Sequence, residues 1–214
     1  MLQFYYKDKS TKEAKQYYHN NLVILCKFNM KEAIKYYEEI PDEIKNANDT
    51  RLLYANFLIN ENKLDNAEAI LYDLYYNKKY LAALDSLARC YFLNKKHDKV
   101  VELLKNLKGE EFDEYGFLAS MFIISKNYIK KLNEKEILKL NNSKFKNMPL
   151  FYTATAHLLF DLKKRGKKHK EQFKKGIKYL KQENILVIST MCDEARIIGL
   201  SDEMIKYLYI ILLI

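Results

Sequence analysis

The chain has 214 residues, a length suited to one globular domain or one run of helical repeats. Its 5 Gly and 2 Pro are too few for the closely spaced turns of an all-β sandwich or barrel. With 49% hydrophobic and 30% charged residues, the composition excludes wholesale disorder, and no apolar run reaches the roughly 20 residues of a membrane span. The composition therefore predicts a soluble, helical protein.

Hydrophobic periodicity predicts an all-α fold of about 10–12 helices. The predicted helices cover residues 11–28, 31–39, 50–61, 64–77, 80–94, 97–107, 112–126, 133–140, 149–163, 169–182, 185–198 and 202–213. We expect Gly199 to end the helix that precedes it. The polar run 141–143 and Pro149 mark the clearest break, where a second subdomain could begin.

A repeat of 33–34 residues runs through the first half of the chain. Small residues recur at equivalent positions, and large apolar residues follow each of them four and seven positions later. The small residues are Ala33, Ala67 and Val100 in the second helix of each unit, and Ala55, Ala88 and Ala119 in the first helix of the next one. We expect these residues to lie where two helices approach closely.

These residues resemble the tetratricopeptide repeat, a 34-residue helix-turn-helix unit. The resemblance implies a right-handed α-solenoid of stacked helix pairs, because one pair cannot bury its apolar face alone. The predicted architecture is a single repeat domain over 1–214. Its best repeats lie at about 16–107, and degenerate repeats and a C-terminal cap follow at about 110–214. The chain departs from the family pattern, because the family's Trp is absent, Ala replaces its Gly, and its closing Pro is missing except for Pro41.

The resemblance also implies that side chains of the first helix of each pair face a concave surface that receives an extended peptide or a helix. In this register the exposed inner positions are Asn56, Asp85, Arg89, Phe92, Ser120 and His157. The predicted function is a non-enzymatic protein-binding adaptor or assembly subunit. The family's clamp for acidic chaperone tails is not expected, because its positions hold Tyr18, Leu22, Leu53, Ala82 and Ser86.

No phosphate loop, dinucleotide fingerprint, nucleophile elbow or zinc-protease motif is present. The histidines and cysteines are dispersed without ligand spacing, at His19, His97, His157, His169, Cys26, Cys90 and Cys192. We therefore expect no catalytic site, metal, cofactor or disulfide, although a Cys–His pair could still form in space. Cys90 is predicted to lie in the core.

The formal charge of +9 is concentrated in one segment. Residues 163–181 hold ten Lys or Arg residues and one acid, Glu171, so the rest of the chain is neutral overall. The candidate basic patch comprises Lys163, Lys164, Arg165, Lys167, Lys168, Lys170, Lys174 and Lys175. It supports an alternative function as an RNA- or ribosome-associated protein, while a solvated loop and helix face remains the simpler interpretation.

The apolar stretch 204–214 is too short to span a membrane and is predicted to be buried, either as a cap on the last helix pair or in a homodimer. Such an ending is weakly similar to tetratricopeptide-type peptide-pheromone receptors. This implies a second alternative, a cytosolic peptide-sensing receptor without a DNA-binding module, because few residues precede the first predicted helix. The N-terminus lacks the apolar core of a secretory signal, which predicts a cytoplasmic location.

Overall fold

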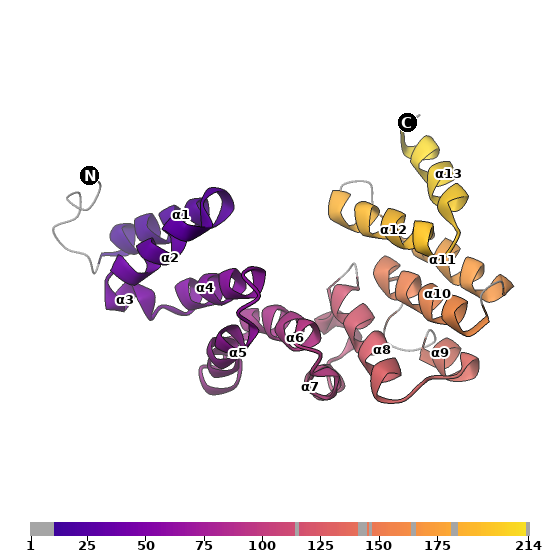
Figure 1. The fold of residues 1–214 in the computed structure, drawn as a ribbon, viewed down its shortest axis with the longest axis horizontal. Coiled ribbons are helices and arrows are strands. Elements are labelled where there is room, and N and C mark those ends of the chain that lie inside the picture. Colours follow the sequence, from indigo (N-terminus) through magenta and orange to yellow (C-terminus); the bar gives the residue numbers. More distant parts are fainter. Residues whose placement is uncertain are drawn as a thin grey trace. The chain divides into compact units, whose positions relative to one another are not determined.

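A computed structural model describes residues 11–113, 116–140, 145, 147–163, 166–180 and 184–212. These residues form thirteen α-helices and no β-strand, which confirms the all-α prediction (Figure 1). The count exceeds the predicted range by one because of α3 (Asp42–Lys45), a single turn after Pro41. Residues 1–10, in which a secretory signal would begin, lie outside the described residues.

The contacts within the chain divide it into two units, Met1–Asn94 (unit 1) and Lys95–Ile214 (unit 2). The break predicted near Pro149 therefore lies inside unit 2. Besides α3, unit 1 contains α1 (Lys12–Phe28), α2 (Met30–Glu39), α4 (Asn48–Asn60), α5 (Leu64–Tyr72) and α6 (Leu84–Leu93). Unit 2 contains α7 (His97–Leu104), α8 (Phe117–Ile129), α9 (Glu134–Leu140), α10 (Pro149–Lys163), α11 (Lys167–Lys178), α12 (Ile185–Ile197) and α13 (Ser201–Leu212).

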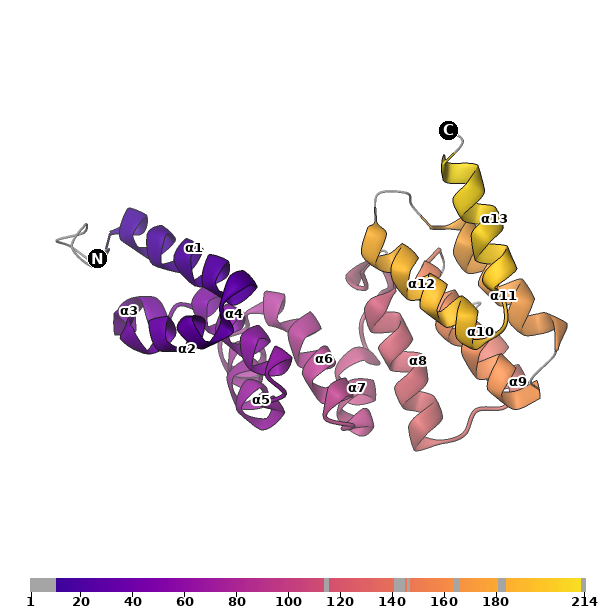
Figure 2. The same cartoon turned by 45° about the horizontal axis from the view of Figure 1, so that its top comes forward.

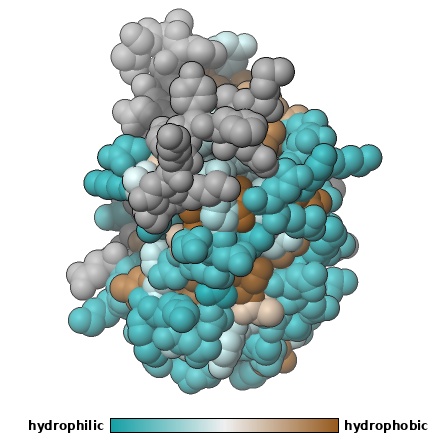
Figure 3. All heavy atoms as spheres, turned by 90° about the vertical axis from the view of Figure 1, so that its left-hand side faces the viewer, coloured by the Kyte–Doolittle hydropathy of each residue, from teal (hydrophilic) through white to brown (hydrophobic). Residues whose placement is uncertain are grey.

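Successive helices pack against one another in unit 1. The first helix, α1, contacts α2, α3 and α4, while α4 contacts α5 and α6, and α5 contacts α6. A π-helical turn, Asp73–Asn77, extends α5 to the end predicted from the sequence. Hydrophilic residues cover most of the coloured surface in Figure 3, and hydrophobic residues show between them.

The small residues of the repeat lie in the core. All six of them are at most 1% exposed. The large apolar residues Leu71, Leu74 and Leu104, which follow two of these positions, are also fully buried. This confirms the sequence-based assignment of the closely packed positions.

The repeat is also visible in the turns that follow α4 and α6. Asn62 and Lys95 each have a φ of 57°, a left-handed conformation that non-glycine residues seldom adopt. The two residues are 33 positions apart, which is the spacing of the small residues. After α4, the Lys63 N–H donates to the Leu58 carbonyl at 2.8 Å and closes the helix end.

The helix predicted over 112–126 begins later than expected. The Asp113 carboxylate accepts hydrogen bonds from the N–H groups of Gly116, Phe117 and Leu118, at 2.6–3.0 Å. Gly116 has a φ of 85°, so the chain turns through a left-handed conformation just before the first helical residue. The predicted start at residue 112 is wrong because Asp113 caps α8 from outside the helix.

Helix α10 is central to unit 2. It contacts α8, α9, α11 and α12, and it lies between α8 and α12 (Figures 1 and 2). Helix α12 ends as predicted, because Gly199 has a φ of 72° and the Leu200 N–H donates to the Ala195 carbonyl at 2.7 Å. None of the described helices is both long and apolar enough to cross a membrane.

Candidate functional site

A pocket of about 360 Å³ opens in unit 2 where α8, α10 and α12 come together. Almost all of its lining belongs to these three helices, and two of them, α8 and α10, are the first helices of predicted pairs. The lining residues are Ser120, Ile124, Asn127 and Tyr128 of α8, Lys131 just after α8, Leu150, Thr153, Ala154, His157, Leu158 and Asp161 of α10, and Thr190 and Glu194 of α12.

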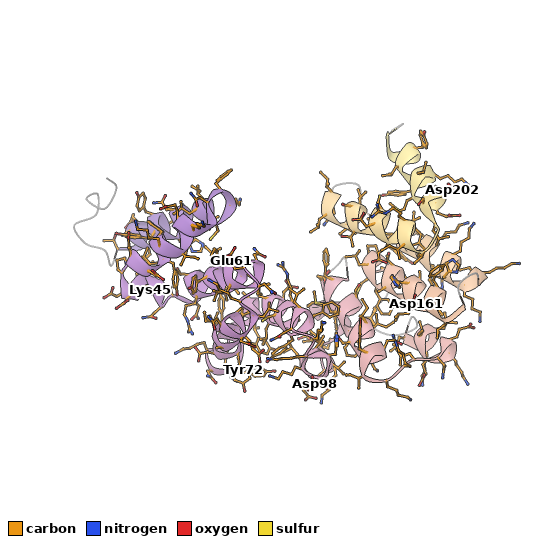
Figure 4. The ribbon with its side chains drawn as sticks, in the orientation of Figure 1. Lys45, Glu61, Tyr72, Asp98, Asp161 and Asp202 are labelled. Atoms are coloured by element: carbon orange, nitrogen blue, oxygen red, sulfur yellow. The ribbon has the colours of Figure 1, made fainter. Side chains whose placement is uncertain are left out.

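Helical spacing places the polar lining of α10 on one face. Thr153, His157 and Asp161 follow one another at intervals of four residues, so they project from the same side of the helix. The Thr153 hydroxyl donates to the Pro149 carbonyl at 2.9 Å, within its own helix. Asp161 lies toward the C-terminal end of α10 (Figure 4).

His157 links α10 to α12. Its Nδ1 lies 2.6 Å from Oε2 of Glu194, and its Nε2 lies 3.6 Å from Oδ2 of Asp161. The hydrogen bond to Glu194, assisted by the charges of both carboxylates, raises the pKa of His157 above its ordinary value, and partial burial of the ring opposes this shift. The pocket therefore holds a cluster in which the His157 ring lies between two carboxylates, which favour its protonated form.

Neither ring nitrogen of His157 is directed at a nucleophile. Both face carboxylates, and the Ser120 hydroxyl donates to the Gly116 carbonyl at 2.6 Å instead. Among the described residues, no group of three or more His, Cys, Asp or Glu side chains is placed to hold a metal ion. The arrangement is suited to holding a polar or charged group beside the apolar side chains of Ile124 and Leu158.

An aromatic side chain forms one edge of the pocket. Tyr128, which is 65% exposed, stacks on His97 of α7 with ring centroids 4.3 Å apart. The ammonium of Lys131 lies 6.0 Å from the centroid of the same tyrosine ring. Burial lowers the pKa of His97, and its Nδ1 lies 3.1 Å from the Ser125 hydroxyl. His97 thus holds the Tyr128 ring in place by stacking on it, and the exposed part of the ring remains accessible to a ligand.

The six predicted groove residues are divided between the two units. Ser120 and His157 line the pocket of unit 2. Asn56 on α4 and Asp85, Arg89 and Phe92 on α6 belong to unit 1. The Arg89 guanidinium, on an exposed side chain, donates to Oδ1 of Asn60 at 3.2 Å.

The sequence analysis missed both acidic partners of His157. Asp161 could have been found from its spacing of four residues on the same predicted helix. Glu194 is 37 residues from His157, and no local pattern connects the two.

Part of the predicted basic patch is neutralised within unit 2. Lys167, Lys168, Lys170, Lys174 and Lys175 are all exposed on α11. Lys168 forms an ion pair with Glu134, and Lys170 forms one with Glu203 at 2.6 Å. Lys164, Arg165 and the side chain of Lys163 lie outside the described residues.

The C-terminal helix α13 contacts α12 and α11. Met204 is 1% exposed, and the Tyr207 hydroxyl donates to the Leu180 carbonyl at 3.1 Å. Ile205 and Tyr209 remain 48% and 64% exposed. The side chains of 210–212, and residues 213–214 altogether, lie outside the described part of the chain.

The prediction that Cys90 lies in the core is confirmed. Cys90 is fully buried, and none of the three cysteines forms a disulfide. Comparison with known proteins adds no assignment, since no family model, no curated protein and no solved structure matches the chain.

Proposed function

We propose that this protein is a tetratricopeptide-like α-solenoid that acts as a non-enzymatic adaptor or assembly subunit. Support for a repeat architecture comes from the buried small residues spaced 33–34 positions apart and from the left-handed turns at Asn62 and Lys95. In this proposal the helix pairs of each unit stack side by side and leave the first helices of successive pairs on one face.

The partner-binding site in this proposal is the pocket between α8, α10 and α12. One observation carries it, namely that α8 and α10, the first helices of two successive predicted pairs, line a single pocket together with α12. Ser120 and His157 each come directly after the small residue of their helix, Ala119 and Ala156, as the concave-face register requires. The mixture of apolar walls, an exposed Tyr128 and a charged cluster suits a protein segment, because aromatic anchors with a polar surround are typical of protein interfaces.

A matched pair of substitutions on α12 tests the site. Thr190→Arg would insert a long side chain into the pocket, whereas Ser189→Arg adds the same side chain at an exposed neighbour that does not line it. For a peptide selected from a display library on the full chain, we expect Thr190→Arg to weaken binding at least tenfold and Ser189→Arg to leave it within about twofold. Equal affinities for both variants would refute the pocket as the binding site.

The surface of unit 1 is tested separately. Charge reversal at Arg89 combined with Phe92→Ala removes an exposed cation and an aromatic ring from α6. If α6 contributes to partner capture, the double variant loses affinity while its thermal stability stays nearly unchanged. Unchanged affinity would show that α6 takes no part in partner capture.

The basic segment on α11 supports a second candidate function, association with RNA. Lys167, Lys174 and Lys175 remain exposed on this helix. The ion pairs of Lys168 and Lys170 reduce the charge available to phosphates, so we rank this function below peptide binding. Binding to an RNA oligomer that weakens steeply with salt would support it, and a flat salt dependence would exclude it.

A further inference from the structure

A second pocket of unit 2, of about 220 Å³, lies at the N-terminus of α11. Its lining comprises Glu134, Leu159, Gly166, Lys167, Lys168 and His169. Helix α11 has 12 residues. As in any α-helix, the N–H groups of its first turn have no partners within the helix, and they carry a partial positive charge. Gly166 has no side chain with which to cap them, and no side-chain cap hydrogen bond is made.

His169, in the first turn, has a polar atom without a partner. The residue is 8% exposed, and its Nδ1 is buried with no hydrogen bond to any described group. The imidazole packs edge-to-face against Phe160 with ring centroids 5.5 Å apart, which fixes its position. A buried nitrogen left unpaired destabilises the folded protein, and proteins usually satisfy such atoms with water, an ion or a ligand.

The charges in this turn are the reverse of those usual at a helix start. Acidic residues normally occupy the first turn, because the positive end of the helix dipole repels cations. Here the first turn carries Lys167 and Lys168 and no acid. Lys168 is paired with Glu134, the one carboxylate among the described lining residues. An anion in the pocket would turn these repulsive interactions into attractive ones.

We propose that this pocket binds a phosphate group, either free phosphate or the phosphoryl group of a small phosphate monoester. Its oxygens would accept hydrogen bonds from the first-turn N–H groups of α11 and from Nδ1–H of His169, in the tautomer that carries the proton there. Lys168 would exchange Glu134 for the anion. The pocket volume is several times the roughly 30 Å³ that a water molecule occupies in the liquid, so it has room for a tetrahedral anion.

Titration of the ¹⁵N-labelled full chain with inorganic phosphate tests the proposal. We expect saturable NMR shifts of the backbone amides of Gly166, Lys167, Lys168 and His169. Parallel titrations with phenyl phosphate distinguish a monoester from the free ion as the tighter ligand. The proposal is overturned if these amides do not saturate, or if chloride at matched ionic strength or dimethyl phosphate, a diester, produces the same shifts.

Three variants locate the contacts. His169→Phe keeps an aromatic ring against Phe160 but removes Nδ1, and should weaken phosphate binding about tenfold. Glu134→Gln removes the competing carboxylate at the surface and should tighten binding about threefold. Lys175→Ala, on the same helix but outside the pocket, should change the affinity less than twofold. Wild-type affinity in His169→Phe, or weaker binding in Glu134→Gln, would contradict the assignment.

Discussion

Replacing Gly176 with Ala should raise the helix propensity of α11 but should also crowd its contact with α10. Gly176 lies in the last turn of α11, at a helical position where Ala is intrinsically favoured over Gly by about 1 kcal/mol. A Cβ at this position would lie 2.9 Å from the carbonyl oxygen of Pro149, 3.3 Å from Cε of Met191 and 3.4 Å from Oγ1 of Thr153. The carbonyl belongs to the first turn of α10 and already accepts the Thr153 hydroxyl, so it has little freedom to move.

Overpacking of this kind costs about 1–3 kcal/mol, and the clash with a backbone atom places Gly176→Ala toward the upper part of that range. After the gain in propensity is subtracted, we expect the variant to lower the free energy of unfolding by about 1–2 kcal/mol. Urea denaturation followed by far-UV circular dichroism measures this change.

Gly199→Ala is the matched control for Gly176→Ala. Its Cβ would meet no atom within 4 Å, but its φ of 72° disfavours any side chain. We expect a loss of about 1 kcal/mol there through backbone strain alone, and Gly199→Asn should recover part of it because Asn tolerates this conformation. If Gly176→Ala instead stabilised the protein by about 1 kcal/mol, as propensity alone predicts, the close approach of α10 and α11 would be refuted.

Three further predictions concern packing, capping and pH. Leu71→Ala, at a fully buried site, should lower the free energy of unfolding by about 2–5 kcal/mol, whereas Leu81→Ala, at a 74% exposed site, should change it by less than about 0.5 kcal/mol. Asp113→Ala should cost about 1 kcal/mol by uncapping α8, and Asp113→Asn should cost less because its amide oxygen still accepts. Because the folded-state pKa of His157 is raised, its pairing with Glu194 should stabilise the protein fully below the ordinary value of 6.5, and this contribution should disappear as the pH rises through the folded-state pKa.

Each of these has an outcome that would count against it. Equal losses for Leu71→Ala and Leu81→Ala would contradict the burial of α5. An unchanged unfolding midpoint in Asp113→Ala would contradict the cap. For His157, the difference in unfolding free energy between wild type and His157→Gln should shrink as the pH rises from about 6 to about 8, and a constant difference would contradict the ion pair.

Most of the helices could be predicted because the periodicity of apolar residues follows directly from the geometry of a helix with one buried face. The buried small residues, such as Ala67 and Ala88, were predictable for the same reason, since their spacing repeats along the chain. The start of α8 was not predictable, because it depends on the Asp113 carboxylate outside the helix and on the left-handed turn at Gly116. The role of Gly176 was missed too, because the sequence around a helical glycine does not reveal which backbone approaches it.

The pocket could be predicted only in part. Ser120 and His157 follow from the helical register, which is local information. The contact between His157 and Glu194 depends on how α10 and α12 pack, and the ion pair between Lys170 and Glu203 depends on how α11 packs beside α13. Such contacts set the charge of a surface, so a net charge read from the sequence overestimated the free basic charge of α11.

Hydrogen–deuterium exchange of the full chain, with and without a saturating selected peptide, tests the proposed binding surface most directly. We predict that the peptide slows exchange in segments 120–131, 150–161 and 190–194, which line the pocket between α8, α10 and α12. If the bound peptide slows exchange in other helices but in none of these three segments, the pocket is not the binding surface.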